Sequence, residues 1–198
     1  DSYLSDLYSS GRSRMRTIEA LNQEAVIQTI YKKNGFIYGP MREMRPIPDM
    51  KDYKIILMLR DPRDVVVSHY YSVAYSHTPR RGVMKERHFA QSLSLDEYAK
   101  RITPHFKPTY VSYIPLLEFP EILFLRYSEM VENPDEFLTR IEDFVGYRFP
   151  ENIRHCLIQD ELTQKNKKGN IHTHRRSGAI GYFHKELSEE TIAFLEHE

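Results

Sequence analysis

A short apolar run, residues 54–60 (KIILMLR), constrains the fold more than any other feature, because it ends directly at Asp61-Pro62. A brief, continuous run rich in isoleucine and leucine is typical of a strand buried on both faces of a parallel sheet. Asp61 suits a helix N-cap, and Pro62 suits the first helical position. The sequence therefore predicts a strand that turns directly into a helix, with Arg60 at the junction.

The rest of the chain alternates between strand and helix signals. A second apolar run, residues 121–127, predicts another buried strand, and residues 76–93 are polar and predict a surface excursion. Caps and apolar periodicity predict helices over further segments, namely residues 15–32, 94–102, 133–146, 151–160 and 187–198. The alternation predicts an α/β fold with a mainly parallel sheet. Ligands bind beyond the carboxyl ends of such strands, so Arg60 and Tyr127 are expected to share a crevice.

Charge and cysteine usage exclude several classes of protein. Lysine and arginine total 28, as do aspartate and glutamate, so the net charge is zero and no nucleic-acid partner is expected. No apolar run reaches the roughly 20 residues that span a bilayer. The first ten residues lack the regions of a signal peptide, and the single Cys156 forms no internal disulfide, so we expect a cytoplasmic protein. The sequence does not set the oligomeric state.

The strand-to-helix junction has the chemistry of an anion site. A helix N-terminus presents unpaired N–H groups and partial positive charge, which favour phosphate. Arg60 adds a planar, permanently charged fork, and Ser68, two turns along the helix, adds a neutral donor. An alternative is equally open, in which Arg60 pairs with Asp61 or Asp64 in a surface ion cluster. Asp64 itself is most simply a helix-start carboxylate, and Arg63 an exposed arginine.

Residues 60–68 (RDPRDVVVS) closely resemble the 3′-phosphate-binding motif of sulfotransferases that use 3′-phosphoadenosine-5′-phosphosulfate (PAPS). The resemblance implies that Arg60 and Ser68 bind the 3′-phosphate of PAPS and of its product, 3′-phosphoadenosine 5′-phosphate (PAP). It implies a three-layer α/β sandwich related to the P-loop nucleotide-binding fold, with an N-terminal part missing. We expect one domain over residues 1–198, which matches the family well over 51–198 and weakly over 1–50.

Two later segments support the same resemblance. Residues 125–146 are similar to the family's tyrosine-acidic segment, which would place Tyr127 near the adenine, although a strand-end core aromatic is an equal alternative. Residues 175–183 (RRSGAIGYF) resemble its late glycine motif. Aligning the glycines makes Arg176 a phosphate-binding residue, puts Ser177 in place of the usual lysine and starts the glycine pair at Gly178. The alternative is an ordinary glycine turn.

The family's 5′-phosphosulfate loop has no convincing counterpart. Residues 9–17 (SSGRSRMRT) share its composition, but no clear strand precedes them and the lysine is missing, so a basic helix start is the simpler interpretation. We infer from the resemblance that this loop belongs to a missing N-terminal segment. No histidine precedes His69, which we expect to point away from the site.

The sequence offers one candidate for the catalytic base. Glu43 is the only carboxylate within residues 35–44, where the family places its base, and it is our candidate beside the alternative of a solvated loop residue. His172 and His174 form a His-x-His pair without an evident third ligand, so no metal is expected.

The resemblance implies transfer of a sulfuryl group from PAPS to a hydroxyl or amine of a small-molecule acceptor. We expect the acceptor near residues 35–50 and 76–93, with Tyr70, Tyr71 and Tyr75 as pocket residues or as core. One alternative is a non-catalytic nucleotide-binding protein with a decayed site. A P-loop small-molecule kinase is less favoured, because the Gly-x-x-x-x-Gly-Lys-Ser/Thr loop is not visible.

Overall fold

The computed structural model describes residues 31, 35–41, 44, 47, 49–76, 83–166 and 178–198, with side chains of the ninth helix described up to residue 160. The chain divides into two compact units, Asp1–Lys54 and Ile55–Glu198. A short 3-10 helix, η1 (Met50–Asp52), belongs to the first unit, and all the elements below belong to the second. A single domain over the whole chain stays a prediction, and the helix expected at 15–32 lies outside the described residues.

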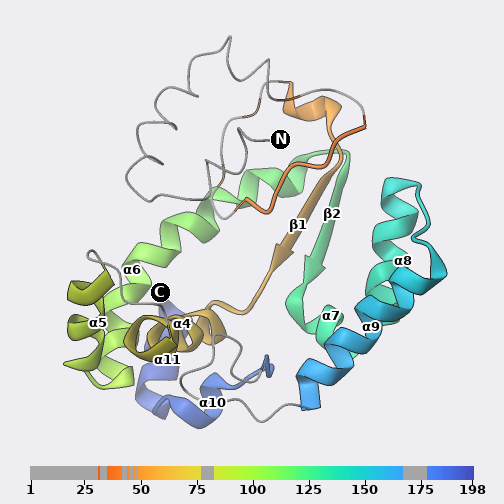
Figure 1. The fold of residues 1–198 in the computed structure, drawn as a ribbon. Helices are drawn as coiled ribbons and strands as arrows, with labels where there is room; N and C mark the ends of the chain where they lie inside the picture. The colour runs from red at the N-terminus through yellow and green to blue at the C-terminus, as the bar shows by residue number, and fades with distance from the viewer. Residues whose placement is uncertain are drawn as a thin grey trace. The chain divides into compact units, whose positions relative to one another are not determined.

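Two parallel strands form the sheet of the described chain (Figure 1). They are β1 (Ile55–Leu59) and β2 (Ile122–Arg126), and their register pairs Ile55 with Ile122 and Leu59 with Arg126. Both strands lie where the apolar runs predicted them, and the α/β class with parallel strands is confirmed. Burial on both faces is wrong for β1. Successive side chains point to opposite faces, so Leu57 is buried while Ile56 is 42% exposed.

The described part of the first half contains three α-helices, two of which begin at predicted caps. They are α4 (Pro62–Tyr71), α5 (Val83–Gln91) and α6 (Leu95–Ser112), with a π-helical η2 (Ser72–Ser76) and a 3-10 helix η3 (Ile114–Glu118). Asp61 accepts a hydrogen bond from Arg63 N, and Ser94 and Glu97 form the predicted capping box. The polar segment predicted at the surface contains α5, whose described side chains are mostly exposed, although Ala90 is fully buried in the core.

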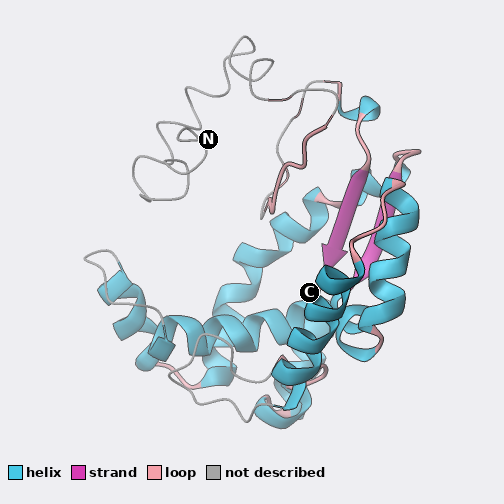
Figure 2. Cartoon of the chain, turned by 45° about the vertical axis from the view of Figure 1, so that its right-hand side comes forward, coloured by secondary structure: helices cyan, strands magenta, loops and turns pink. Residues whose placement is uncertain are grey.

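The second half of the chain is helical after β2 (Figure 2). Its helices are α7 (Tyr127–Glu132), α8 (Pro134–Val145), α9 (Glu151–Asn166), α10 (Phe183–Glu186) and α11 (Glu189–His197). Asn133 caps α8, and Gly146 ends it with a φ of 73°, as the sequence predicted. Among the described residues, no helix combines the length and the apolar character that crossing a membrane requires.

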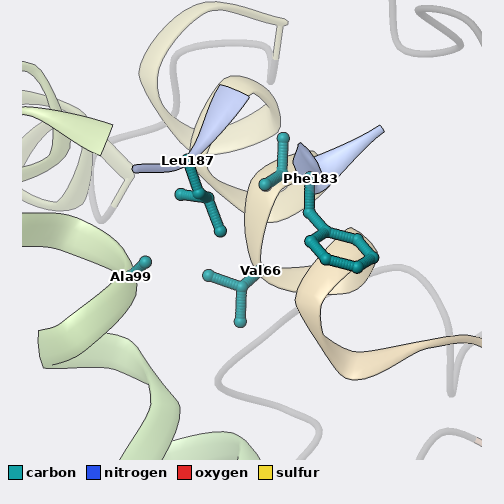
Figure 3. Packing of buried hydrophobic residues seen from close by; sticks show 5 residues of the cluster. Val66, Ala99, Phe183 and Leu187 are labelled. Atoms are coloured by element: carbon teal, nitrogen blue, oxygen red, sulfur yellow. The ribbon is translucent and has the colours of Figure 1, made fainter. Parts of the chain in front are cut away.

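The core fixes α4 between α6 and the C-terminal segment. Val66 and Val67 of α4 pack with Ala99, Phe183 and Leu187 (Figure 3). Fully burying a valine, leucine or phenylalanine side chain contributes roughly 1.5–3 kcal/mol to the free energy of unfolding. A second cluster joins α4 and η2 to α5 and α6 through buried side chains, namely Tyr70, Val73, Ala74, Ala90 and Tyr98. Because the helix is held on both sides, the Arg60 end of α4 has a defined position within this unit.

Candidate functional site

Arg60 is the centre of the site. It follows β1 directly, and its side chain is 24% exposed. Its Nη2 atom donates to the Ala179 carbonyl at 3.1 Å and lies 3.9 Å from Asp64 Oδ2. Its Nε atom is buried and has no hydrogen-bond partner in the described part of the chain. Leaving a buried N–H donor of a charged side chain without a hydrogen-bond partner is energetically unfavourable. Most buried polar groups in proteins have a partner, so an unpaired one calls for an explanation, such as a ligand that binds there.

Tyr127 meets Arg60 at the end of the neighbouring strand. Tyr127 is the first residue of α7, directly after β2. The Arg60 guanidinium carbon lies 4.7 Å from the centre of its ring, within the range of a cation–π interaction. The Tyr127 hydroxyl donates to the Gly178 carbonyl at 3.3 Å. The structure therefore brings these two predicted residues together, because parallel strands end at the same edge of the sheet.

The late glycine segment forms the third side of the site. Gly178 and Gly181 have φ values of 59° and 66°, in the left-handed region that favours glycine. A Cβ atom on Gly178 would lie 3.2 Å from the Tyr127 hydroxyl. Glycine is therefore needed here both for its backbone conformation and for the close approach of the tyrosine.

Asp64 forms the ion pair with Arg60 that the sequence left open, and it also has backbone partners that the sequence did not predict. Its side chain is 2% exposed. Oδ2 accepts from Gly181 N at 2.9 Å, and Oδ1 accepts from Phe183 N at 3.2 Å. A carboxylate in a first helical turn has a common local explanation, and no local pattern pointed to partners 117 and 119 residues away. The sequence signal for Asp64 was its position four residues after Arg60, a spacing that allows the two side chains to pair.

Ser68 lies on α4 and is partly buried. Residues four apart on a helix share a face, so Ser68 lies one turn beyond Asp64 on the side that carries the Arg60 contact. Its role toward a phosphate stays a prediction. His69, by contrast, contacts α6, where its Nδ1 atom lies 2.7 Å from the Tyr98 hydroxyl and its ring forms a T-shaped contact with that of Phe106.

Arg63 is not the exposed arginine that the sequence suggested. It binds Asp61 through two nitrogens and Glu196 at 2.6 Å, and its guanidinium carbon lies 4.1 Å from the centre of the Phe183 ring. The hydrogen bond with Asp61 raises the pKa of Arg63. Burial acts to raise the pKa of Asp61, but the hydrogen bonds from Arg63 outweigh it and leave that pKa lowered. Arg63 therefore ties α4 to α10 and α11.

The tyrosines after the motif mainly form core. Tyr70 is buried, and its ring packs against those of Tyr98, Tyr71 and Tyr75. Burial raises its pKa to about 12. The Tyr71 hydroxyl donates to Glu186 of α10. Of the two interpretations given to these residues, core packing holds for Tyr70.

Several predicted site residues lie outside the described part of the chain. They are Glu43, Arg176 and Ser177, together with His172, His174 and residues 9–17. Their roles stay predictions. Within the described ranges, no three histidine, cysteine, aspartate or glutamate side chains are arranged to hold a metal ion.

A second polar cluster joins α8 to α9, away from the site. Glu142 is buried and accepts from Phe149 N at 2.8 Å, from Arg148 at 3.0 Å and from Arg154. Burial acts to raise the pKa of Glu142, but these hydrogen bonds and charges outweigh it and leave the pKa lowered. Groups of the same chain thus supply hydrogen bonds to both oxygens of this carboxylate, which is typical of an ion cluster with a structural role.

The site offers a cation, an aromatic face and glycine backbone at one edge of a sheet. The guanidinium of Arg60 matches the oxygens of a phosphate, and an aromatic ring beside it suits a nucleotide. The adjacent N-terminus of α4 favours negative charge. The arrangement is chemically suited to an anionic, ring-bearing ligand.

The fold has solved relatives. One is a mouse sulfotransferase, SULT7A1, complexed with PAP, at a TM-score of 0.54 and 14% identity, where the match covers 73% of this chain and 55% of that chain. Another is a retinol dehydratase in complex with androsterone and inactive cofactor PAP, at a TM-score of 0.48 and 20% identity, covering 76% and 47% of the two chains. The chain thus spans about half the length of these proteins.

The family comparison covers most of the chain. Residues 40–197 match the model of the sulfotransferase domain. This range includes both strands, the Arg60 junction, Tyr127 and the late glycine segment. The mouse enzyme shares the fold. The motifs, the parallel strands and the family model all indicate the same family. The chain belongs to the sulfotransferase domain family.

Proposed function

We propose that this protein binds PAPS and transfers its sulfuryl group to a hydroxyl or amine of a small-molecule acceptor, releasing PAP. The observation that carries the proposal is the environment of Arg60. Its guanidinium lies at the carboxyl edge of the sheet, against Tyr127, with the Nε donor unpartnered among the described residues. A phosphate oxygen is the acceptor that best matches the Nε–Nη2 edge of such a fork.

The Ala179 carbonyl bears on how a nucleotide would bind. It accepts from Arg60 Nη2, the nitrogen that a phosphate would also use. The contact with the carbonyl is already charge-assisted on the arginine side, but a phosphate is an anion and adds Coulombic attraction that a neutral carbonyl lacks. Because Nη2 carries two N–H groups, it can donate to a phosphate oxygen and keep its contact with the Ala179 carbonyl.

The other predicted site residues would each contact a different part of the nucleotide. Ser68 would add a neutral donor to the 3′-phosphate, and the ring of Tyr127 would lie near the adenine. Arg176, Ser177 and the backbone at Gly178 would contribute further donors to the phosphates. None of these groups needs to change its charge during the reaction, so they serve to bind and orient the donor.

The chemical step would resemble phosphoryl transfer in its requirements. The acceptor oxygen or nitrogen attacks sulfur, the bond from sulfur to the bridging oxygen of the nucleotide breaks, and the acceptor proton passes to a base. Glu43 is the candidate for that base. Positive charge around the transferring group would supply most of the stabilisation.

Two measurements test the proposal. Titration calorimetry compares PAP with ADP, which also carries two phosphates but places both on the 5′ side. PAP is the first nucleotide to test, since the mouse sulfotransferase was solved with it. We expect clear preference for PAP, and equal binding of the two nucleotides would refute the assignment.

Turnover separates an enzyme from a binding protein. The protein is incubated with PAPS and a panel of phenols, steroids, sugars and amines, and PAP release is followed. Release that depends on an acceptor supports transfer. Tight PAP binding without release from any acceptor would instead identify a non-catalytic nucleotide-binding protein.

A further inference from the structure

Asp64 is a buried carboxylate next to a proposed phosphate site, where its charge is unfavourable for the ligand. Its Oδ2 atom lies 3.9 Å from Arg60 Nη2, beyond hydrogen-bond distance. A phosphate on the same guanidinium would feel the repulsion of this like charge at short range. The same carboxylate forms a long ion pair with Arg60, so its net effect on the site depends on its other contacts.

Both oxygens of Asp64 are directed at the late glycine segment. Oδ2 accepts from Gly181 N, and Oδ1 accepts from Phe183 N. The same segment is bonded to Arg60 through the Ala179 carbonyl. Arg60, the segment from Ala179 to Phe183, and Asp64 thus form a closed cycle of contacts, in which moving any one member breaks a hydrogen bond.

Helix α4 makes this cycle rigid. Val66 and Val67, just beyond Asp64, are 2% and 1% exposed in the core cluster that includes Phe183. Asp64 therefore stands on a helix that cannot shift without opening the core. Through its hydrogen bonds with Gly181 N and Phe183 N, the carboxylate holds the late glycine segment in a fixed position relative to α4.

We infer that Asp64 is a positioning residue for the nucleotide, which sets the 178–183 backbone and the Arg60 guanidinium at the spacing that a 3′-phosphate requires. This inference rests on the proposed function. Asp64 touches neither nucleotide nor acceptor in this role, and it acts through the two backbone N–H groups that it accepts from.

The test uses Asp64→Asn, which keeps the size of the side chain. An amide has one acceptor oxygen, so its NH2 group faces one of the two backbone N–H groups, donor against donor. The substitution also removes the negative charge. A positioning role and a charge role therefore predict opposite changes in nucleotide affinity.

Calorimetry compares PAP with adenosine 5′-monophosphate, which lacks only the 3′-phosphate. For Asp64→Asn we expect PAP affinity to fall by about tenfold or more, with a much smaller change for the monophosphate. Asp64→Glu keeps both acceptors and the charge, and should recover part of the preference. Unchanged or tighter PAP binding by Asp64→Asn would overturn the inference.

A matched control separates positioning from stability. Glu142→Gln also neutralises a buried carboxylate that accepts a backbone N–H and faces arginines, but it lies on α8. It should lower the melting temperature and leave the preference for PAP intact. If Glu142→Gln loses the preference to the same degree as Asp64→Asn, general destabilisation explains both, and the positioning role is wrong.

Amide hydrogen exchange gives a readout that needs no ligand. Asp64→Asn should speed exchange at Gly181 and Phe183, whereas Glu142→Gln should leave both amides protected. Unaltered exchange in Asp64→Asn would show that the Asp64 carboxylate does not hold the Gly181 and Phe183 amides. If the unmutated protein binds both nucleotides equally, the proposed function fails, and the exchange data still decide whether Asp64 holds the segment.

Discussion

The guanidinium carbon of Arg60 lies 4.7 Å from the centre of the Tyr127 ring, so the ends of β1 and β2 are joined by a direct side-chain contact. Both residues also bond to the late glycine segment, Arg60 to the Ala179 carbonyl and Tyr127 to the Gly178 carbonyl. Three parts of the chain thus meet at one cation. Predictions about this site can be tested one contact at a time.

Replacing Arg60 should remove the preference for PAP. The loss of a charge-assisted hydrogen bond costs about 1.5–3 kcal/mol, which is roughly tenfold to a hundredfold in affinity. Arg60→Ala should show this loss in calorimetry, and Arg60→Lys an intermediate one, because lysine keeps the charge without the fork. Arg140→Ala is the control, since Arg140 also pairs with a carboxylate, Glu129, and donates to a carbonyl, that of Phe124. Wild-type affinity in Arg60→Ala would exclude a phosphate contact.

Replacing Ser68 should have a smaller effect. A neutral hydrogen bond contributes about 0.5–1.5 kcal/mol, so Ser68→Ala should weaken PAP binding by roughly twofold to tenfold. The same variant should bind adenosine 5′-monophosphate normally. Ser92→Ala, which removes an exposed hydroxyl bonded to the Phe89 carbonyl of α5, is the control. An equal loss for both nucleotides in Ser68→Ala would place the hydroxyl elsewhere.

Gly178→Ala should destabilise the protein for two reasons. The left-handed backbone costs an alanine about 1–2 kcal/mol, and the new Cβ atom lies 3.2 Å from the Tyr127 hydroxyl. Gly146→Ala, with a φ of 73° and nothing within 4 Å of its Cβ atom, isolates the backbone cost. Urea unfolding should show the larger loss for Gly178→Ala. Combining Gly178→Ala with Tyr127→Phe should remove this extra loss, because the crowded hydroxyl is gone, and strict additivity of the two substitutions would argue against the contact.

The Glu142 cluster predicts a pH dependence of stability. The folded pKa of Glu142 lies below its ordinary value of 4.5, so the unfolded state binds the proton more readily. Its contribution to the free energy of unfolding is therefore complete above pH 4.5 and is lost as the pH falls through the lower folded pKa. The stability difference between the unmutated protein and Glu142→Gln should shrink in acid.

Asp143→Asn provides the comparison for this titration. Asp143 pairs with the same Arg148 but is 60% exposed. Exposed ion pairs contribute little, so urea unfolding of Asp143→Asn should follow the unmutated protein at every pH. A difference for Glu142→Gln that stays constant into acid would show that packing, and not the charge, accounts for its effect.

Local sequence patterns were sufficient for the junction on which the site is built. The apolar run predicted β1, Asp61 and Pro62 predicted the start of α4, and the Ser94–Glu97 box predicted the start of α6. These signals depend only on neighbouring residues, because caps and short apolar runs act within one turn or one strand. The end of α6 was not predicted correctly. Helix α6 continues past the expected residue 102 to Ser112, through two prolines.

Long-range contacts accounted for what the sequence did not predict. The apolar run suggested a strand buried on both faces, but the side chain of Ile56 is 42% exposed. The polar segment after η2 contains α5, whose Ala90 is buried against residues of other helices. Burial depends on which segments pack together, and a local pattern carries no information about the partner.

The sequence by itself determined the chemical groups of the site and the two strand ends that carry Arg60 and Tyr127. It also predicted that these two residues lie close together, and the structure places the Arg60 guanidinium carbon 4.7 Å from the centre of the Tyr127 ring. Only the tertiary structure decided that Asp64 accepts hydrogen bonds from Gly181 and Phe183. The physical reason is separation along the chain, since Asp64 and Gly181 are 117 residues apart. A carboxylate looks the same in sequence whether it faces solvent or a backbone amide, and only folding assigns its partner.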